Sequence, residues 1–136
     1  MTGTERDTLV LSSSYDELER IEPWLKELQE RLDFHNDEFA RIMLALSEAV
    51  TNAIVHGNRE DPGKSVTVRS AMEDGRLRLS VQDEGEGFEP GKLPDPLQEE
   101  NLLKEGGRGV YLIEQYCDAV NYSRGGTRIT MDFDLD

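Results

Sequence analysis

Residues 66–82 read VTVRSAMEDGRLRLSVQ, and this stretch decides which kind of sheet the chain forms. Apolar and polar side chains alternate on both sides of Asp74-Gly75, a dipeptide typical of tight hairpin turns. Such alternation places one set of side chains on a buried face and the other set in solvent. We therefore expect two antiparallel strands joined by a hairpin, with one face of their sheet covered.

Other segments extend this sheet. The tail alternates in the same way over residues 129–135, a short strand is expected around Leu9 and Leu11, and residues 120–122 fit another strand. Helices must cover the buried face, so the expected fold is α+β. It is a two-layer α/β sandwich with a mixed, mainly antiparallel sheet covered on one face by helices. A chain of 136 residues fits a single domain, residues 1–136.

A first helix is expected from the S-x-x-E sequence of residues 14–17, which has the form of a capping box. Its apolar residues from Leu18 to Leu32 are spaced three and four apart and form one stripe. That stripe fits a core-facing helix, and part of it also fits a dimer or partner surface. Pro23 is too far along for a regular first turn, so we expect an irregular one.

A second helix is expected from an N-cap at Asn36 or Asp37 to about His56, and Gly57 with Asn58 suits its C-terminal cap. Glu48, Asn52 and His56 are four residues apart, so their side chains share one stripe of an otherwise apolar helix. A polar stripe of this kind fits a solvent-exposed face or a functional site.

Two glycine-containing elements follow. Asp83-x-Gly85-x-Gly87 puts a carboxylate at a strand end, followed by glycines that allow close backbone approach to a ligand; an acidic turn would look similar. Gly107-Arg108-Gly109 precedes a helix expected over residues 110–116. Free N–H groups at a helix start, beside an arginine, can hold phosphate, although a flexible linker fits the same residues.

The segment between these two elements contains prolines and glycines and shows no periodicity. A loop of this length inside a small domain is usually functional. We expect a flexible lid over about residues 88–106.

Taken together and in this order, the three elements resemble the nucleotide-binding boxes of the GHKL ATPase superfamily, which includes gyrase-type ATPases, heat-shock chaperones, histidine kinases and mismatch-repair ATPases. The strings LSEAVTNAIVHG (residues 46–57) and GRGVYLI (residues 107–113) narrow the resemblance to the anti-sigma-factor serine kinases. The chain has no dimerisation helix with a phospho-accepting histidine, as histidine kinases have. The resemblance implies a Bergerat-type ATP-binding fold with ATP and Mg²⁺ as cofactors.

The resemblance also assigns roles to single residues. Glu48 would be the catalytic general base, and Asn52 would be the Mg²⁺ ligand. Asp83 would accept a hydrogen bond from the adenine amino group, with Gly85 and Gly87 letting the backbone pass beneath the base.

The phosphates would be held by Gly107, Arg108 and Gly109, and Thr127 would support adenine directly or through water. His56 is expected to be structural, and so is Cys117, the single cysteine of the chain.

Composition limits the choice of partners. The formal net charge is −14, which disfavours binding of nucleic acid. The longest uninterrupted aliphatic stretch, residues 42–46, is too short to span a bilayer, and the first residues lack the apolar core of a signal peptide. We therefore expect a cytoplasmic location and no membrane contact.

The sequence thus predicts a Mg-ATP-dependent serine/threonine-protein kinase that acts as an anti-sigma factor. The resemblance implies that it binds a sigma factor, phosphorylates a serine of an anti-sigma-factor antagonist, and forms a homodimer. Two alternatives stay open: a switch or kinase of the same fold with a client outside sigma-factor control, and a non-catalytic ATP-binding module.

Overall fold

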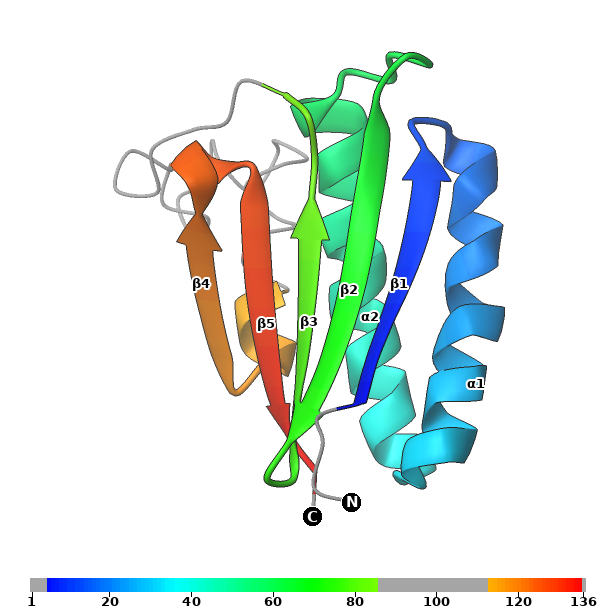
Figure 1. Cartoon of the computed structure of the whole chain (residues 1–136), viewed down its shortest axis with the longest axis vertical. Coiled ribbons are helices and arrows are strands. Elements are labelled where there is room, and N and C mark those ends of the chain that lie inside the picture. Colours follow the sequence, from blue (N-terminus) through cyan, green and yellow to red (C-terminus); the bar gives the residue numbers. More distant parts are fainter. Residues whose placement is uncertain (1–4, 86–112, 136) are drawn as a thin grey trace.

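The computed structural model describes residues 5–85 and 113–135. Within them, five strands form one sheet, in the spatial order β1-β2-β3-β5-β4 (Figure 1). Every neighbouring pair of strands in this sheet is antiparallel. The bounds are β1 Glu5–Ser12, β2 Ser65–Glu73, β3 Arg76–Gln82, β4 Ala119–Ser123 and β5 Arg128–Asp134.

The hairpin expected at Asp74-Gly75 joins β2 to β3. Both residues have positive φ, 53° and 77°, which is the backbone twist that a two-residue hairpin turn requires. Glu73 therefore pairs with Arg76, and the resulting register places Met72 opposite Leu77 and Val68 opposite Val81. The alternation of the sequence thus becomes a sheet with one apolar face.

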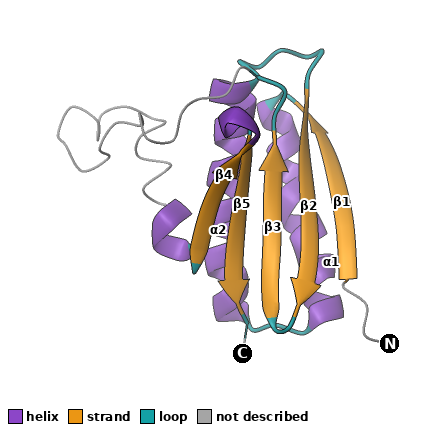
Figure 2. Cartoon of the chain, turned by 60° about the vertical axis from the view of Figure 1, so that its left-hand side comes forward, coloured by secondary structure: helices purple, strands orange, loops and turns teal. Residues whose placement is uncertain are grey.

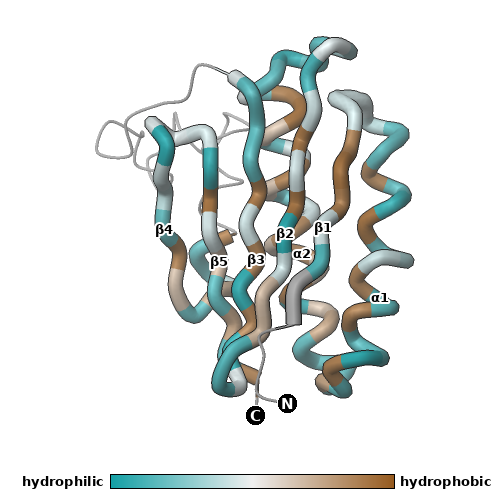
Figure 3. Tube along the Cα trace, in the orientation of Figure 1, coloured by the Kyte–Doolittle hydropathy of each residue, from teal (hydrophilic) through white to brown (hydrophobic). Residues whose placement is uncertain are grey.

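Two helices cover that apolar face, α1 Ile21–Leu32 and α2 Asn36–Asn52 (Figure 2). Hydrophobic residues recur along the strands of the sheet and along both helices (Figure 3). The core contains the expected residues of the hairpin and the tail, and Leu25, Leu46, Leu79 and Phe133 are fully buried. The predicted α+β two-layer fold is confirmed.

The starts of both helices differ from expectation. Ser14 caps a 3-10 helix, Tyr15–Arg20, that runs directly into α1, and Glu17 accepts a hydrogen bond from the backbone N–H of Ser12 instead of closing a capping box on Ser14. The irregular first turn expected near Pro23 is this 3-10 segment. The N-cap of α2 is His35, not Asn36 or Asp37, and it makes no side-chain cap hydrogen bond.

The end of the second helix differs as well. The α-helical part stops at Asn52, and a π-helical turn, Ala53–Gly57, follows. A π turn adds a residue per turn, and such turns are frequent at functional sites. The other described helical pieces are residues 113–116 and the short 3-10 turn Arg124–Gly126 between β4 and β5.

Several expectations fall on residues that are not described. They are the lid at about 88–106, the start of the helix predicted from residue 110, and the four site residues Gly87, Gly107, Arg108 and Gly109. Among the helices of residues 5–85 and 113–135, none is long and apolar enough to cross a membrane.

Candidate functional site

The predicted site residues of the described chain come from three elements that meet at one end of the sheet. The C-terminal end of α2, the end of β3 and the start of β5 lie together at the top of Figure 1. This arrangement follows from the antiparallel pairing of β3 with β5, in which Gln82 lies opposite Arg128. Asp83, which follows β3, and Thr127, which precedes β5, are therefore neighbours, and the Asp83 N–H donates to the Thr127 carbonyl at 2.9 Å.

Backbone contact joins the end of the second helix to the segment after β3. A Cβ atom on Gly57 would lie 2.4 Å from Oδ2 of Asp83, and a Cβ on Gly85 would lie 2.0 Å from the carbonyl oxygen of Gly57. Real Cβ atoms do not approach other atoms so closely, so both positions need glycine for this packing. The helix that carries Glu48 and Asn52 is thus held directly against Asp83.

Asp83 is half-buried, and its carboxylate is held in place by a hydrogen bond from within the turn that follows it. The Gly85 N–H donates to Oδ1 of Asp83 at 2.8 Å. Burial raises the pKa of Asp83 above its ordinary value, while the Gly85 N–H and the charge of Lys64 act in the opposite direction. The result is a partly desolvated acceptor, which suits recognition of an amino group.

Asn58 organises the same region, and sequence reasoning assigned it only a helix cap. Its side chain is buried and donates to the Ser13 hydroxyl at 2.9 Å and to the Ser65 carbonyl at 3.0 Å. Its Oδ1 accepts from the Glu84 N–H at 2.7 Å. Asn58 therefore ties the residue after Asp83 to β2 and to the segment after β1; the sequence alone does not distinguish this role from an ordinary C-cap.

Gln82 is a second residue that the sequence did not single out, because it occupies an ordinary polar position of the alternating strand. Its Nε2 donates to the Thr127 hydroxyl at 2.7 Å and to the Asp83 carbonyl at 2.9 Å. The Thr127 hydroxyl in turn donates to the Arg124 carbonyl at 2.8 Å. Thr127 is therefore fixed in orientation beside Asp83.

Glu48 and Asn52 lie one turn apart on α2, and both are half-buried. Neither side chain makes a hydrogen bond or ion pair with another residue of the described part. His56, next in the stripe, is exposed. A half-buried carboxylate and amide that bond no other described residue can contact an external ligand, and a neutral amide oxygen is a suitable ligand for Mg²⁺.

The described part of the site fits an adenine nucleotide. Asp83 supplies a hydrogen-bond acceptor, Gly57 and Gly85 leave no side chain between the helix and the turn, and Asn52 offers an amide oxygen that bonds no other described residue. Cys117 has no part in this set: burial raises the pKa of its thiol to about 12, so it stays protonated and fits the packing role expected of it.

Comparison with known proteins agrees with this geometry. The histidine kinase-like ATPase domain family matches residues 11–133. The serine-protein kinase RsbW of Bacillus subtilis (strain 168) is 34% identical over 108 residues, covering 74% of this chain and 68% of that protein. The anti-sigma F factor of Clostridium acetobutylicum is 39% identical over 105 residues, covering 74% of this chain and 73% of its own length.

A further relative is the anti-sigma F factor of Geobacillus stearothermophilus, 38% identical over 97 residues; the match spans 66% of this chain and 63%, less than two thirds, of that protein. Among solved structures, the RsbU and RsbW domains of Rv1364c from Mycobacterium tuberculosis superpose with a TM-score of 0.70 at 20% identity. That superposition covers 96% of this chain and 32% of the other, and it supports the fold.

Proposed function

The chain belongs to the histidine kinase-like ATPase domain family and is a relative of RsbW and the anti-sigma F factors, and from this premise we propose that it is a Mg-ATP-dependent serine/threonine-protein kinase acting as an anti-sigma factor. It binds a sigma factor and phosphorylates a serine of an antagonist protein. It works in the cytoplasm as a homodimer. It does not bind nucleic acid, because a formal net charge of −14 repels phosphates.

One observation carries the proposal. The helix end at Gly57 is packed against Asp83 so closely that neither Gly57 nor Gly85 has room for a Cβ atom. The contact brings together two sequence elements that are far apart in the chain, the Glu48–Asn52 helix and the Asp83-x-Gly85 turn. A nucleotide bound here would have its base at Asp83 and its phosphates toward α2.

Each residue of the proposed site has its own role in binding the nucleotide. Asp83 accepts a hydrogen bond from the adenine amino group, Gly85 and Gly87 let the backbone pass beneath the base, and Thr127 supports it. Asn52 contributes an oxygen ligand to Mg²⁺, which when bound neutralises phosphate charge.

Glu48 removes the proton from the substrate serine hydroxyl. The serine oxygen then bonds to the γ-phosphorus while the bond to the β-phosphate oxygen breaks, and ADP leaves. Gly107, Arg108 and Gly109, which lie outside the described residues, are proposed to hold the terminal phosphates.

The decisive test separates the base from the metal ligand. Glu48→Gln keeps the side-chain shape and loses the base, so it should leave ATP affinity nearly unchanged and slow transfer by roughly a hundredfold or more. Asn52→Ala should weaken Mg-ATP binding and abolish transfer. The measurements are calorimetric binding of Mg-ATP and transfer of radiolabelled phosphate to the cognate antagonist.

Exposed Glu27, on the neighbouring helix α1, offers a matched control, and Glu27→Gln should transfer phosphate at nearly the wild-type rate. If Glu48→Gln also transfers at that rate, Glu48 is not the base. A wild type that binds Mg-ATP well and phosphorylates no sigma-pathway antagonist would favour the non-catalytic binding module, and one that binds no ATP would end the proposal.

A further inference from the structure

The open face of the sheet, opposite the helices, is rich in arginine. Alternation along the strands turns Val68, Leu79 and Ile129 toward the helices, so their neighbours in the strands point the other way. The arginines of this open face are Arg69 on β2, Arg76 and Arg78 on β3, and Arg128 on β5. The chain as a whole carries 29 acidic and 15 basic residues, so such a concentration of arginine needs an explanation.

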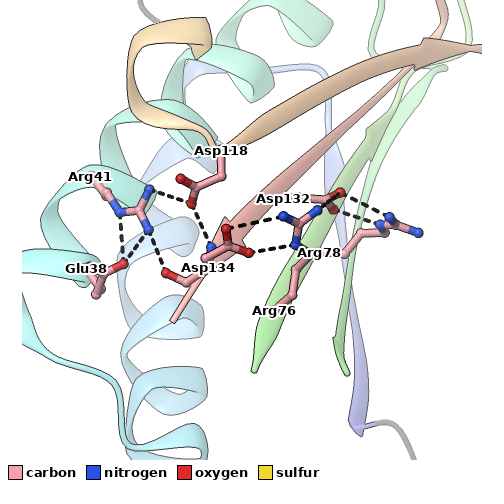
Figure 4. A network of polar contacts seen from close by, with 7 residues as sticks. All are labelled: Glu38, Arg41, Arg76, Arg78, Asp118, Asp132 and Asp134. Carbon is pink, nitrogen blue, oxygen red and sulfur yellow. Dashed lines mark hydrogen bonds and ion pairs between the residues drawn. The ribbon is translucent and has the colours of Figure 1, made fainter. Parts of the chain in front are cut away.

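Two of these arginines are neutralised by carboxylates of the neighbouring strand (Figure 4). Arg78 bonds Asp132 through two nitrogens, at 2.8 and 3.0 Å, and Arg76 bonds Asp134 at 2.7 and 3.2 Å. These partners raise the pKa of both arginines. One end of the open face is thus a set of satisfied ion pairs.

The other end is different. Arg128 lies there, opposite Gln82, and Arg69 lies one rung nearer the middle of the sheet, opposite Ser80. Together with Arg124 of the turn between β4 and β5, these three residues are named the arginine patch. None of the three forms an ion pair with a carboxylate of residues 5–85 or 113–135. The pKa of Arg128 lies below its ordinary value, first because the group is partly buried and then because Arg124 and Arg69 repel its charge. The described part of the chain therefore provides no carboxylate partner for these three arginines.

The arginine patch adjoins an exposed apolar side chain and the candidate nucleotide site. Val10, which is 52% exposed, lies on the same rung of the sheet as Thr67, Gln82 and Arg128. Arg128 donates to Oε1 of Gln82 at 3.0 Å, and Gln82 donates to the Thr127 hydroxyl. Arginines beside an exposed apolar group are typical of protein interfaces.

We propose that the arginine patch, together with Val10, is a docking site for an acidic segment of a protein partner. Carboxylates of the partner would supply the counter-charges that residues 5–85 and 113–135 do not provide, while an apolar side chain would cover Val10. A nucleic acid is the poorer occupant, because its run of phosphates would extend beyond the three arginines and meet the acidic remainder of a chain of net charge −14, whereas a short acidic segment needs to contact the arginines alone. The docking site goes beyond the proposed kinase function, since it does not require nucleotide.

The test uses the full chain without nucleotide and a fluorescein-labelled oligoglutamate peptide as the probe. Fluorescence anisotropy should show binding that weakens as salt is raised. The triple variant Arg69→Gln, Arg124→Gln, Arg128→Gln should bind the probe about tenfold more weakly, the effect of three exposed ion pairs. A matched triple variant, Lys26→Gln, Arg31→Gln, Arg59→Gln, changes the net charge equally at exposed residues outside the patch and should bind like the wild type.

Three outcomes would overturn the proposal. One is equal loss of binding in both triple variants, which would mean general electrostatics. Another is binding of an oligothymidylate probe as tight as that of oligoglutamate, which would assign the patch to nucleic acid. The third is a patch variant that is monomeric while the matched variant remains a dimer, because the occupant would then be a second copy of this chain. Mg-ATP binding, measured on the same samples, shows separately whether the proposed nucleotide site is intact.

Discussion

At the residue scale, the candidate site is centred on a half-buried carboxylate, that of Asp83. Asp83 has one oxygen bonded to the Gly85 N–H and the other against Gly57. Burial raises its pKa and thereby makes the ionised form easier to protonate than an ordinary aspartate. A ligand amino group would supply a donor to the second oxygen, which accepts no hydrogen bond from residues 5–85 or 113–135.

Asp83→Asn tests this reading of the carboxylate. The amide keeps the size of the side chain and loses the charge, so ATP affinity should fall about tenfold or more, as expected for a lost charge-assisted hydrogen bond. Scanning calorimetry with and without Mg-ATP should show most of the ligand-induced rise in Tm disappearing. Asp61→Asn, at an exposed position, is the control. An Asp83→Asn variant whose Tm rises with Mg-ATP as much as that of the wild type would contradict the role of Asp83 in binding ATP.

Asn58 is the buried polar residue whose loss should cost most stability. Asn58→Ala leaves the Glu84 N–H and the Ser65 carbonyl without their side-chain partner, which should lower the free energy of unfolding by about 2–3 kcal/mol. Asn121→Ala, at an exposed position of β4, should change it by no more than about 0.5 kcal/mol. Urea unfolding followed by circular dichroism measures both, and equal stabilities of the two variants would refute the role given to Asn58.

At the element scale, Arg41 anchors α2 to the segment that leads into β4. Its Nη1 donates to Asp118 at 3.1 Å, and its Nη2 donates to the Asp134 carbonyl at 3.0 Å (Figure 4). Its Nη1 also donates to the Tyr116 carbonyl at 3.1 Å. Its guanidinium also bonds Glu38 and lies 5.3 Å from the centre of the Phe133 ring. One side chain thus fixes how the second helix sits against both ends of the β4–β5 hairpin.

Arg41→Met should lower the free energy of unfolding by about 1–2 kcal/mol at neutral pH, because several carbonyl and carboxylate partners are lost together. The pKa of Asp118 is lowered, first by the Asp134 N–H and also by Arg41. The stabilisation from Asp118 is therefore present above the ordinary aspartate range, about pH 4, and is lost as pH falls through the lowered pKa. The cost of Arg41→Met should shrink accordingly on acidification.

Urea titrations at a series of pH values measure this dependence. Arg31→Met, which removes the exposed pair with Asp7, serves as the control and should cost no more than about 0.5 kcal/mol at any pH. A cost for Arg41→Met that stays constant from neutral to acid pH would show that Asp118 contributes nothing to the anchor.

At the scale of the whole molecule, one face of the sheet is not covered by the described helices. In the proposed homodimer, that face or the first helix would form the interface between the two copies. Closed two-fold dimers are the commonest assembly of soluble chains. Light scattering at micromolar concentration should return about twice the 15.4 kDa mass of the chain. A monomer at that concentration would remove the dimer from the proposal without affecting the nucleotide site.

The sequence by itself determined the strands of the sheet and the polar stripe of the second helix, because the spacing of apolar and polar residues along the chain is a local property. Alternation over residues 66–82 predicted the hairpin and its buried face, and the four-residue spacing placed Glu48 and Asn52 together on one helix. The sequence determines the order of the strands less directly, because that order depends on which segments, distant along the chain, pair with one another.

Only the tertiary structure decided which residues surround Asp83. The contact of Gly57 with Asp83 and Gly85, the three bonds of Asn58 and the link from Gln82 to Thr127 all join residues across strand or helix boundaries. Local pattern makes Asn58 a helix cap and Gln82 a solvent-facing strand residue. Their actual roles arise because burial removes water as a partner, and each polar group must then bond whichever group the packing brings near.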